Sequence, residues 1–262
     1  MDILIKIIVC FIAGVGAGLG TGFAGMSAAA AISPLLITFL GMDAYEAVGI
    51  ALASDVLASA FSAYTYWKNK HLDVRNGIIM MITVLVFTAI GSWVASFVPS
   101  TTMTDLSFLM TMMLGIKFIV WPVTRTYDHM QTLSKTQQVL RSVISGTVIG
   151  SICGFVGAGG GMMMLLVLTM VLGYELKTAV GTSVFIMSFT ALTGSVSHFV
   201  IDGAPDWLCL AVCIASTLLW AQIAAKIANK ADTKTLNRVT GVVLLAIGLS
   251  VLGVNIFKNF FI

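Results

Sequence analysis

Ten long apolar runs, separated by short polar connections, constrain this chain more than any other feature of its sequence. The runs cover residues 3–24, 25–41, 44–67, 77–98, 103–122, 139–157, 158–173, 177–201, 206–225 and 236–257. A helix needs about 20 apolar residues to cross the hydrocarbon core of a bilayer, and most runs are near that length. None alternates as a strand does, so helices are expected throughout. The sequence predicts an all-α polytopic membrane protein.

The composition excludes several other classes of protein. Apolar residues make up 58% of the 262 residues, and only 10% are Asp, Glu, Lys or Arg, against about 25% charged in globular domains. An isolated soluble enzyme, a nucleic-acid binder and a disordered chain are therefore excluded. The sequence has no HExxH, Walker or Ser-His-Asp pattern, so we expect neither catalysis nor a cofactor, and the lipid bilayer is the expected environment.

The two halves of the chain share a glycine pattern. Window 14–49 holds eight glycines and window 146–181 holds nine, so about two coincidences are expected by chance at any one offset. At an offset of 132 residues six coincide, namely Gly14/Gly146, Gly18/Gly150, Gly22/Gly154, Gly25/Gly157, Gly41/Gly173 and Gly49/Gly181. We therefore predict two transmembrane repeats, 1–122 and 136–262, each with about five helical segments and joined by a cytoplasmic connection at 123–135.

The placement of Lys and Arg predicts the orientation of these repeats. The connections at 68–75, 123–141 and 226–238 hold ten of the fourteen basic residues, so they are expected in the cytoplasm. The alternate connections carry acidic residues and no Lys or Arg, which places both termini outside. Each half then crosses the membrane an odd number of times. The second repeat is therefore inverted relative to the first, an arrangement typical of transporters, here in the inner membrane of a bacterium.

The glycine cluster of the second half predicts a broken helix inside the membrane. The apolar stretch before Gly157 runs from Val143 to Val156 and covers only about 21 Å, short of a core of about 30 Å. Irregular backbone at that depth must line a cavity or be buried in protein. The helix that resumes after it points N–H groups into this space, where they attract an anion. The expected substrate-binding residues are Gly157, Gly159, Gly160 and Gly161, with Gly22, Gly25, Met26 and Ser27 from the first half.

Close helix packing is the competing interpretation of these glycines. The stripes formed by Gly14, Gly18 and Gly22, and by their partners in the second half, have the four-residue spacing of packing motifs, and we favour that role for them. Three consecutive glycines at 159–161 weaken a helix and form no stripe, so a functional break is favoured there. Two such breaks meeting near the membrane centre would make a site for a small oxyanion.

Further motifs follow each glycine-rich hairpin. They are Leu40-Gly41 with Ala47-Val48-Gly49, and Leu172-Gly173 with Ala179-Val180-Gly181. Gly181-Thr182-Ser183-Val184 looks like a "GTS" segment, and His198, Gly203 and Asp206-Trp207 look like an "H…G…DW" ending. Over nearly its whole length the chain thereby resembles the TauE/SafE sulfite exporter family. The resemblance implies export of sulfite, sulfoacetate or a related sulfur-containing organic anion.

The two halves differ at the GTS segment. Thr182 and Ser183 can add hydroxyl donors to the anion site, whereas Gly49-Ile50-Ala51-Leu52 has no Thr-Ser pair in the first half. One half of the site is therefore altered, and the identity of the substrate stays open.

Asp55 is the one acidic residue well inside an apolar run. A carboxyl group there is costly and indicates a functional site, so Asp55 is a candidate for carrying a coupling proton. A structural hydrogen bond to Ser54 or Ser59 is the alternative. The residue at the 132 offset is Met187, so either role is restricted to the first half.

Metal binding is the weaker interpretation of the His, Cys and Met residues. His71, His129 and His198 have no paired ligand at helical spacing, so zinc is not expected. Cys209 and Cys213 on one helix face could suit a soft metal, as could Cys153 with Met162-Met163-Met164, but both residue types are common in apolar cores.

The sequence thus predicts a secondary transporter, in the exporting direction, for a small sulfur-containing anion, working by alternating access. The alternatives are a membrane partner protein that hands on sulfur or a soft metal, and a passive anion channel. Whether the protein forms a homodimer is left open.

Overall fold

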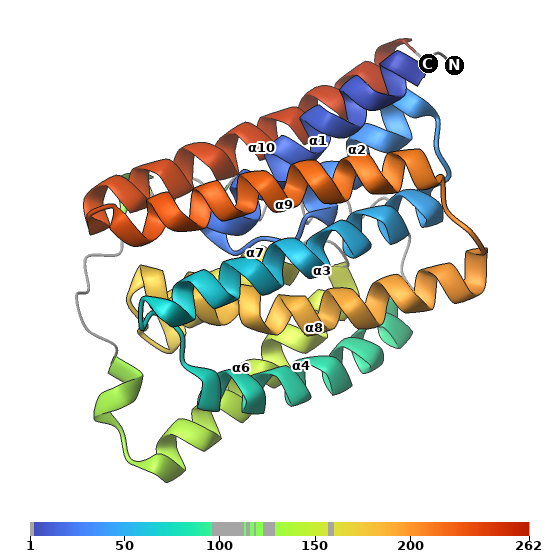
Figure 1. Ribbon diagram of the computed structural model, residues 1–262. Coiled ribbons are helices and arrows are strands. Elements are labelled where there is room, and N and C mark those ends of the chain that lie inside the picture. The colour runs from blue at the N-terminus through green and yellow to red at the C-terminus, as the bar shows by residue number, and fades with distance from the viewer. Residues whose placement is uncertain are drawn as a thin grey trace.

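The computed structural model describes residues 3–95, 113, 116–117, 119–122, 129–156 and 160–261, and the regular elements in these ranges are all helices (Figure 1). The first half contains α1 (Ile3–Ala24), α2 (Ala29–Leu40), α3 (Ala44–Lys68) and α4 (Val74–Ala95). The second contains the short 3-10 helix η1 (His129–Thr132), α6 (Lys135–Val156), α7 (Gly160–Leu166), the π-helical turn η3 (Val167–Val171), α8 (Leu176–Asp202), α9 (Trp207–Lys230) and α10 (Thr233–Phe261). The all-helical prediction is confirmed.

The helix bounds follow the apolar runs closely, and the run at 103–122 lies mostly outside the described residues. Four described helices are long and apolar enough to cross a membrane, with candidate spans at Ile3–Ala24, Glu46–Lys68, Leu176–Val200 and Trp207–Lys230. The 12 residues of α2 rise only about 18 Å, too little to cross the core of a bilayer. The chain is therefore a multi-pass membrane protein in which α1 and α2 form a hairpin of unequal arms.

The connections of the long helices gather at two opposite ends of the molecule (Figure 1). At one end, the His71 ring Nδ1 lies 2.7 Å from Asn229 Oδ1, and Lys177 donates to the Asn229 carbonyl at 3.0 Å. At the other, Lys6 Nζ lies 2.6 Å from Asp206 Oδ2. The basic connections at 68–75 and 226–238 thus share one end, and the start of α1 lies at the other.

Asp206 contacts several helices at the second of these ends. Its carboxylate accepts hydrogen bonds from Leu208 N–H and Cys209 N–H and so caps α9, while its own N–H donates to Glu46 Oε1 of α3 at 2.7 Å. The hydrogen bond and charge of Lys6 hold the pKa of the Asp206 carboxyl below its usual range. One residue therefore joins the starts of α1, α3 and α9, through its carboxylate and its backbone N–H.

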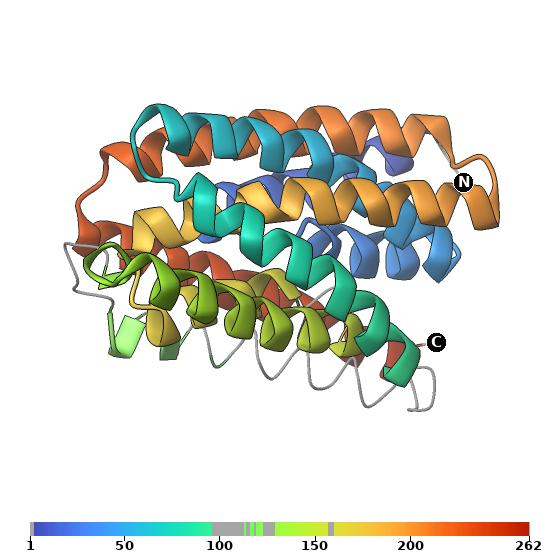
Figure 2. The same ribbon diagram turned by 90° about the horizontal axis from the view of Figure 1, so that it is seen from below.

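Both glycine stripes lie against other helices at very short range. A Cβ atom at Gly18 of α1 would lie 2.6 Å from the Thr217 carbonyl oxygen of α9, and one at Gly150 of α6 would lie 2.6 Å from the Val84 carbonyl oxygen of α4. The packing role expected for these stripes agrees with this geometry. Figure 2 shows the resulting pairing of α4 with α6 along one side of the bundle.

Two further glycines bring α3 and α8 together in a reciprocal way. Gly49, early in α3, faces His198 near the end of α8, where an added Cβ would lie 3.1 Å from the histidine Cβ. Gly181, early in α8, faces Tyr66 near the end of α3, with the two corresponding atoms 2.8 Å apart. The two helices therefore pack antiparallel, and residues 132 apart in sequence make matching contacts.

The glycine contacts predict different costs for two neighbouring substitutions in α1. Gly18→Ala should destabilise the protein by about 1–3 kcal/mol, because the new methyl group meets backbone atoms of α9. Gly16→Ala is the matched control, since nothing lies within 4 Å of its added Cβ, and it should be neutral or stabilising by up to about 1 kcal/mol. Thermal unfolding in detergent measures both changes. Equal effects of the two substitutions would contradict the packing role.

The two ends of the bundle predict a labelling pattern. A cysteine at the exposed residue Asn69 should react with an impermeant thiol reagent only from the cytoplasm, because the basic connections are expected on that side. A cysteine at Ala204, exposed at the opposite end, should react only from outside. Labelling of intact cells and of inverted vesicles measures this. Reaction of both positions from the same side would show that the helices do not cross the membrane as proposed.

Candidate functional site

The candidate site is the break between α1 and α2 at residues 25–28. Gly25 has a φ of +62°, a conformation that favours glycine. Its N–H donates to the Thr21 carbonyl at 3.0 Å, and Met26 N–H donates to the Gly20 carbonyl at 3.3 Å. Met26 and Ser27 are buried, with 2% and 6% of their surface exposed. This irregular backbone is therefore enclosed by protein, as a membrane-embedded break requires.

Side chains from three other helices bind the end of α1. The Tyr66 hydroxyl of α3 donates to the Gly22 carbonyl at 2.8 Å, and the Thr240 hydroxyl of α10 donates to the Phe23 carbonyl at 3.2 Å. Ser183 of α8 donates to the Gly25 carbonyl at 2.7 Å. The carbonyl groups that a helix end leaves without intrahelical partners are thereby satisfied from outside the helix.

The side chain of Asp55 reaches from α3 to the start of α2. This fully buried residue lies close to the middle of α3, and its Oδ2 accepts the Ala28 N–H at 3.1 Å. Its Oδ1 accepts the Ser59 hydroxyl at 2.7 Å, and the Ser27 hydroxyl also interacts with the carboxyl group, while the nearby Thr21 hydroxyl donates to the Met26 carbonyl at 3.0 Å. A carboxylate at this position is stabilised by the N-terminal end of the helix dipole. The donors at the first break are thus already occupied by a carboxyl group of the protein itself.

The hydroxyls of the GTS segment have structural partners. Thr182 Oγ1 accepts the Asp73 N–H at 3.2 Å, next to the start of α4. The Ser183 hydroxyl donates to the Gly25 carbonyl. The structure therefore brings Ser183 to the break together with Gly25, Met26, Ser27 and Asp55, while Thr182 faces the connection between α3 and α4.

The second glycine cluster is described only in part. Gly157 and Gly159 lie outside the described residues, and Gly160 and Gly161 form the first turn of α7. The π-helical turn that follows ends at Val171, and Gly173, two residues further on, has a φ of +72°. Tyr174 N–H then donates to the Leu168 carbonyl at 3.0 Å, and Met42 N–H donates in the same way to Leu36, 132 residues earlier. The two hairpins therefore end with the same type of backbone hydrogen bond.

Metal ligands are not gathered in the described part of the chain. No group of three His, Cys, Asp or Glu residues there could hold a metal ion. His71 contacts Asn229 and Glu175 instead, and Cys213 donates to the Cys10 carbonyl at 3.7 Å. The side chains of Cys153 and Met162 lie outside the described set.

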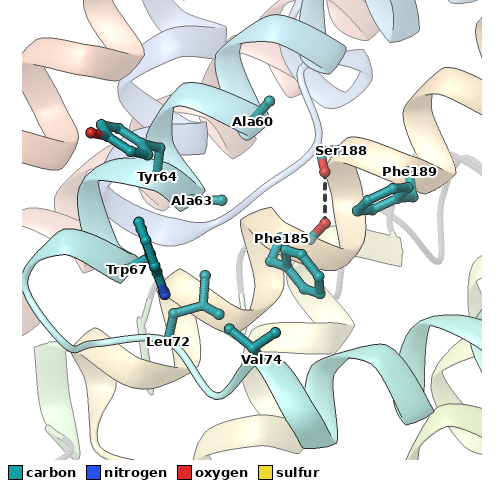
Figure 3. A pocket seen from close by; sticks show the side chains of 9 residues that line it. All are labelled: Ala60, Ala63, Tyr64, Trp67, Leu72, Val74, Phe185, Ser188 and Phe189. Atoms are coloured by element: carbon teal, nitrogen blue, oxygen red, sulfur yellow. Dashed lines mark hydrogen bonds between the residues drawn. The ribbon is translucent and has the colours of Figure 1, made fainter.

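A groove of about 450 Å³ lies between α3, α4 and α8 (Figure 3). Its lining is almost entirely apolar or aromatic, including Trp67 and Phe189. The hydroxyl of Ser188, which also lines it, donates to the Phe185 carbonyl at 2.7 Å. This groove suits an apolar chain and is a poor place for a small oxyanion, which needs free donors.

The hydrogen bond expected between Ser59 and Asp55 is present, whereas two other residues at the break, Tyr66 and Thr240, were not predicted from sequence. Tyr66 lies eleven positions after Asp55, so helical periodicity places it on the same face of α3, and this signal could have identified it. Thr240 has no comparable signal, because its contact with Phe23 joins residues 217 positions apart.

A bundle of apolar helices around a buried, polar helix break is the architecture of a membrane transporter. Residues 10–251 match the Sulfite exporter TauE/SafE family, and the chain belongs to that family. It is 26% identical to the "Probable membrane transporter protein YunE" of Bacillus subtilis (strain 168), covering 98% of this chain and 100% of the relative. It is also 26% identical to a "Probable membrane transporter protein" of Haemophilus influenzae, covering 86% of this chain and 87% of the relative. A third relative, from Methanocaldococcus jannaschii, is 28% identical over 73% of this chain and 70% of its own length.

The geometry of the break predicts the effect of adding one methyl group. Gly25→Ala should cost about 1–2 kcal/mol for the left-handed backbone, and more because the new Cβ would lie 2.9 Å from Ser183 Oγ. Gly41→Ala is the control, with a φ of +61° and nothing within 4 Å of its added Cβ. Thermal unfolding should show the larger loss for Gly25→Ala, with part of the difference removed when Ser183→Ala is added. No rescue by Ser183→Ala would argue against the contact.

Proposed function

We propose that this protein transports a small sulfur-containing anion, such as sulfite or an organosulfonate, across the bacterial inner membrane, as an exporter working by alternating access. The observation that carries the proposal is the buried break at residues 25–28, where a backbone N–H and the hydroxyl groups of Ser59 and Ser27 surround the Asp55 carboxyl group. Membership of a family described as sulfite exporters supports the class of substrate.

Alternating access is supported by the matching contacts of the two halves. Gly181 lies 132 positions after Gly49, and His198 lies 132 positions after Tyr66. The Gly49–His198 contact in one direction therefore corresponds to the Gly181–Tyr66 contact in the other. A two-fold rotation about an axis perpendicular to both helices would relate the antiparallel helices α3 and α8 in this way. If these helices cross the membrane, that axis lies in its plane, which is the symmetry of inverted repeats.

The proposed anion site draws on both hairpins. Gly22, Gly25, Met26 and Ser27 contribute from the first break, and Gly157, Gly159, Gly160 and Gly161 contribute from the second. Ser183 adds its hydroxyl group at the break, Thr182 adds one from beside the connection between α3 and α4, and Asp55 is the coupling residue. In the described part of the break, the hydrogen bonds to the Asp55 carboxyl group come from uncharged donors. Such donors suit a transporter, because they hold an anion without the tight pairing that would prevent its release.

Anion flux into proteoliposomes tests this function. We expect the purified protein to move radiolabelled sulfite, thiosulfate or a small organosulfonate at a saturable rate, and unlabelled anion on the far side should accelerate exchange, as a carrier requires. Empty liposomes are the control. Flux that does not saturate and shows no exchange would favour the passive channel, and no flux of any of these anions would favour a protein that hands on sulfur or a metal.

A further inference from the structure

The carboxyl group of Asp55 is an oxyanion held in a site built for one. It is fully buried, and its hydrogen bonds come from the Ala28 N–H at the start of α2 and the Ser59 hydroxyl. The Ser27 hydroxyl also interacts with the carboxyl group, and the nearby Thr21 hydroxyl donates to the Met26 carbonyl at 3.0 Å. A helix N-terminus with several hydroxyls is also the donor set proposed for the transported anion.

The charged groups on the neighbouring helices are engaged elsewhere. On α1, Lys6 pairs with Asp206. On α8, Lys177 donates to the Asn229 carbonyl, and His198 packs beside Gly49. The described ionisable residues of α9 lie toward its two ends, and α2 contains none; those of α9 are Cys209, Cys213, Lys226 and Lys230. Within the described residues, the polar partners of Asp55 are thus uncharged, so its negative charge is most simply removed by a proton.

Ser62 provides an independent sign that this region accepts a ligand. Its hydroxyl is fully buried and has no hydrogen-bond partner in the structure. It lies on the face of α3 that carries Asp55, Ser59 and Tyr66, one turn beyond Ser59. An unpaired buried hydroxyl costs about 1–3 kcal/mol, and an anion or water beside it would satisfy it.

We propose that the Asp55 carboxylate competes with the transported anion for the donors at the start of α2, so that the anion binds only when Asp55 takes up a proton. This inference rests on the proposed function and deepens it. Two negative charges a few ångströms apart strongly disfavour each other. A proton from the aqueous side converts the Asp55 carboxylate to a neutral carboxylic acid, which releases the Ala28 N–H and the hydroxyls to the anion. On the opposite side the anion and the proton leave, and the carboxylate returns to the donors.

Competition of this kind determines the direction in which protons move relative to the transported anion. The anion and the proton are loaded together, so they cross the membrane in the same direction. An inward proton gradient then drives the anion into the cell, and export requires an outward gradient of the anion itself. Met187 occupies the position in the second half that corresponds to Asp55, so each chain carries a single such carboxyl group at these two positions.

Proton movement driven by an anion gradient tests the competition. Proteoliposomes containing a trapped pH indicator are given an inward gradient of thiosulfate or methanesulfonate, which carry no titratable proton near neutral pH. The wild-type protein should acidify the interior while labelled anion enters. Asp55→Asn should continue to exchange labelled anion and should no longer acidify the interior.

A matched pair of serine variants keeps the test independent of the folding of Asp55→Asn. Ser59 donates to Asp55, whereas Ser54, also fully buried on α3, donates to the Ile50 carbonyl. Losing the Ser59 hydroxyl removes a donor from the carboxylate, so Ser59→Ala should extend anion uptake to higher pH by about one pH unit. Ser54→Ala should leave the pH profile of uptake unchanged.

The outcomes separate the inference from the function on which it rests. Anion uptake without acidification in the wild type, or with the pH profile of Ser59→Ala unchanged, would overturn the competition and leave the transport function standing. Alkalinisation during anion entry would show that protons move in the opposite direction and would overturn it as well. If neither these anions nor sulfite moves at all, the proposed function and this inference both fail.

Discussion

Every backbone polar group released by the break at Gly25 needs a partner, and the rest of the bundle depends on this requirement. Inside a membrane protein, water is not freely available to bind the last carbonyls of α1 or the first N–H groups of α2. The structure supplies these partners from α3, α8 and α10, through Tyr66, Asp55, Ser183 and Thr240. A short irregular segment thereby fixes the relative position of the helices that surround it.

Close approach of the helices makes these hydrogen bonds possible. Ser183 reaches the Gly25 carbonyl from α8, and nearby Gly181 allows that helix to pack so closely on the end of α3 that a Cβ atom would contact the His71 carbonyl. Glycine in a helix interior costs about 1 kcal/mol relative to alanine. Here the cost is offset by packing and by the polar contacts that packing permits, since helices in lipid have little hydrophobic drive to associate.

The sequence predicted local features of the molecule well and long-range contacts poorly. The bounds of α1 and α3 could be read from the apolar runs, because the thickness of the bilayer sets their length. Asp55 could be identified because an acidic residue inside such a run is costly. Its pairing with Ala28 could not be read, since the loop between α2 and α3 determines which residues meet. Ser183 was expected to bind substrate, and its contact with a backbone carbonyl 158 residues away has no local signal.

The polar groups of the two halves are distributed unequally around the first break. Asp55 and Ser183 both bind there, one from each half of the chain. The residues at the corresponding positions are Met187 and Ala51, which are buried and carry no group able to hold a helix end by a side-chain hydrogen bond of this kind. The matching contacts of α3 and α8 therefore repeat the packing of the two halves without repeating their chemistry. Under the proposed mechanism, proton-linked steps are therefore expected at the first break.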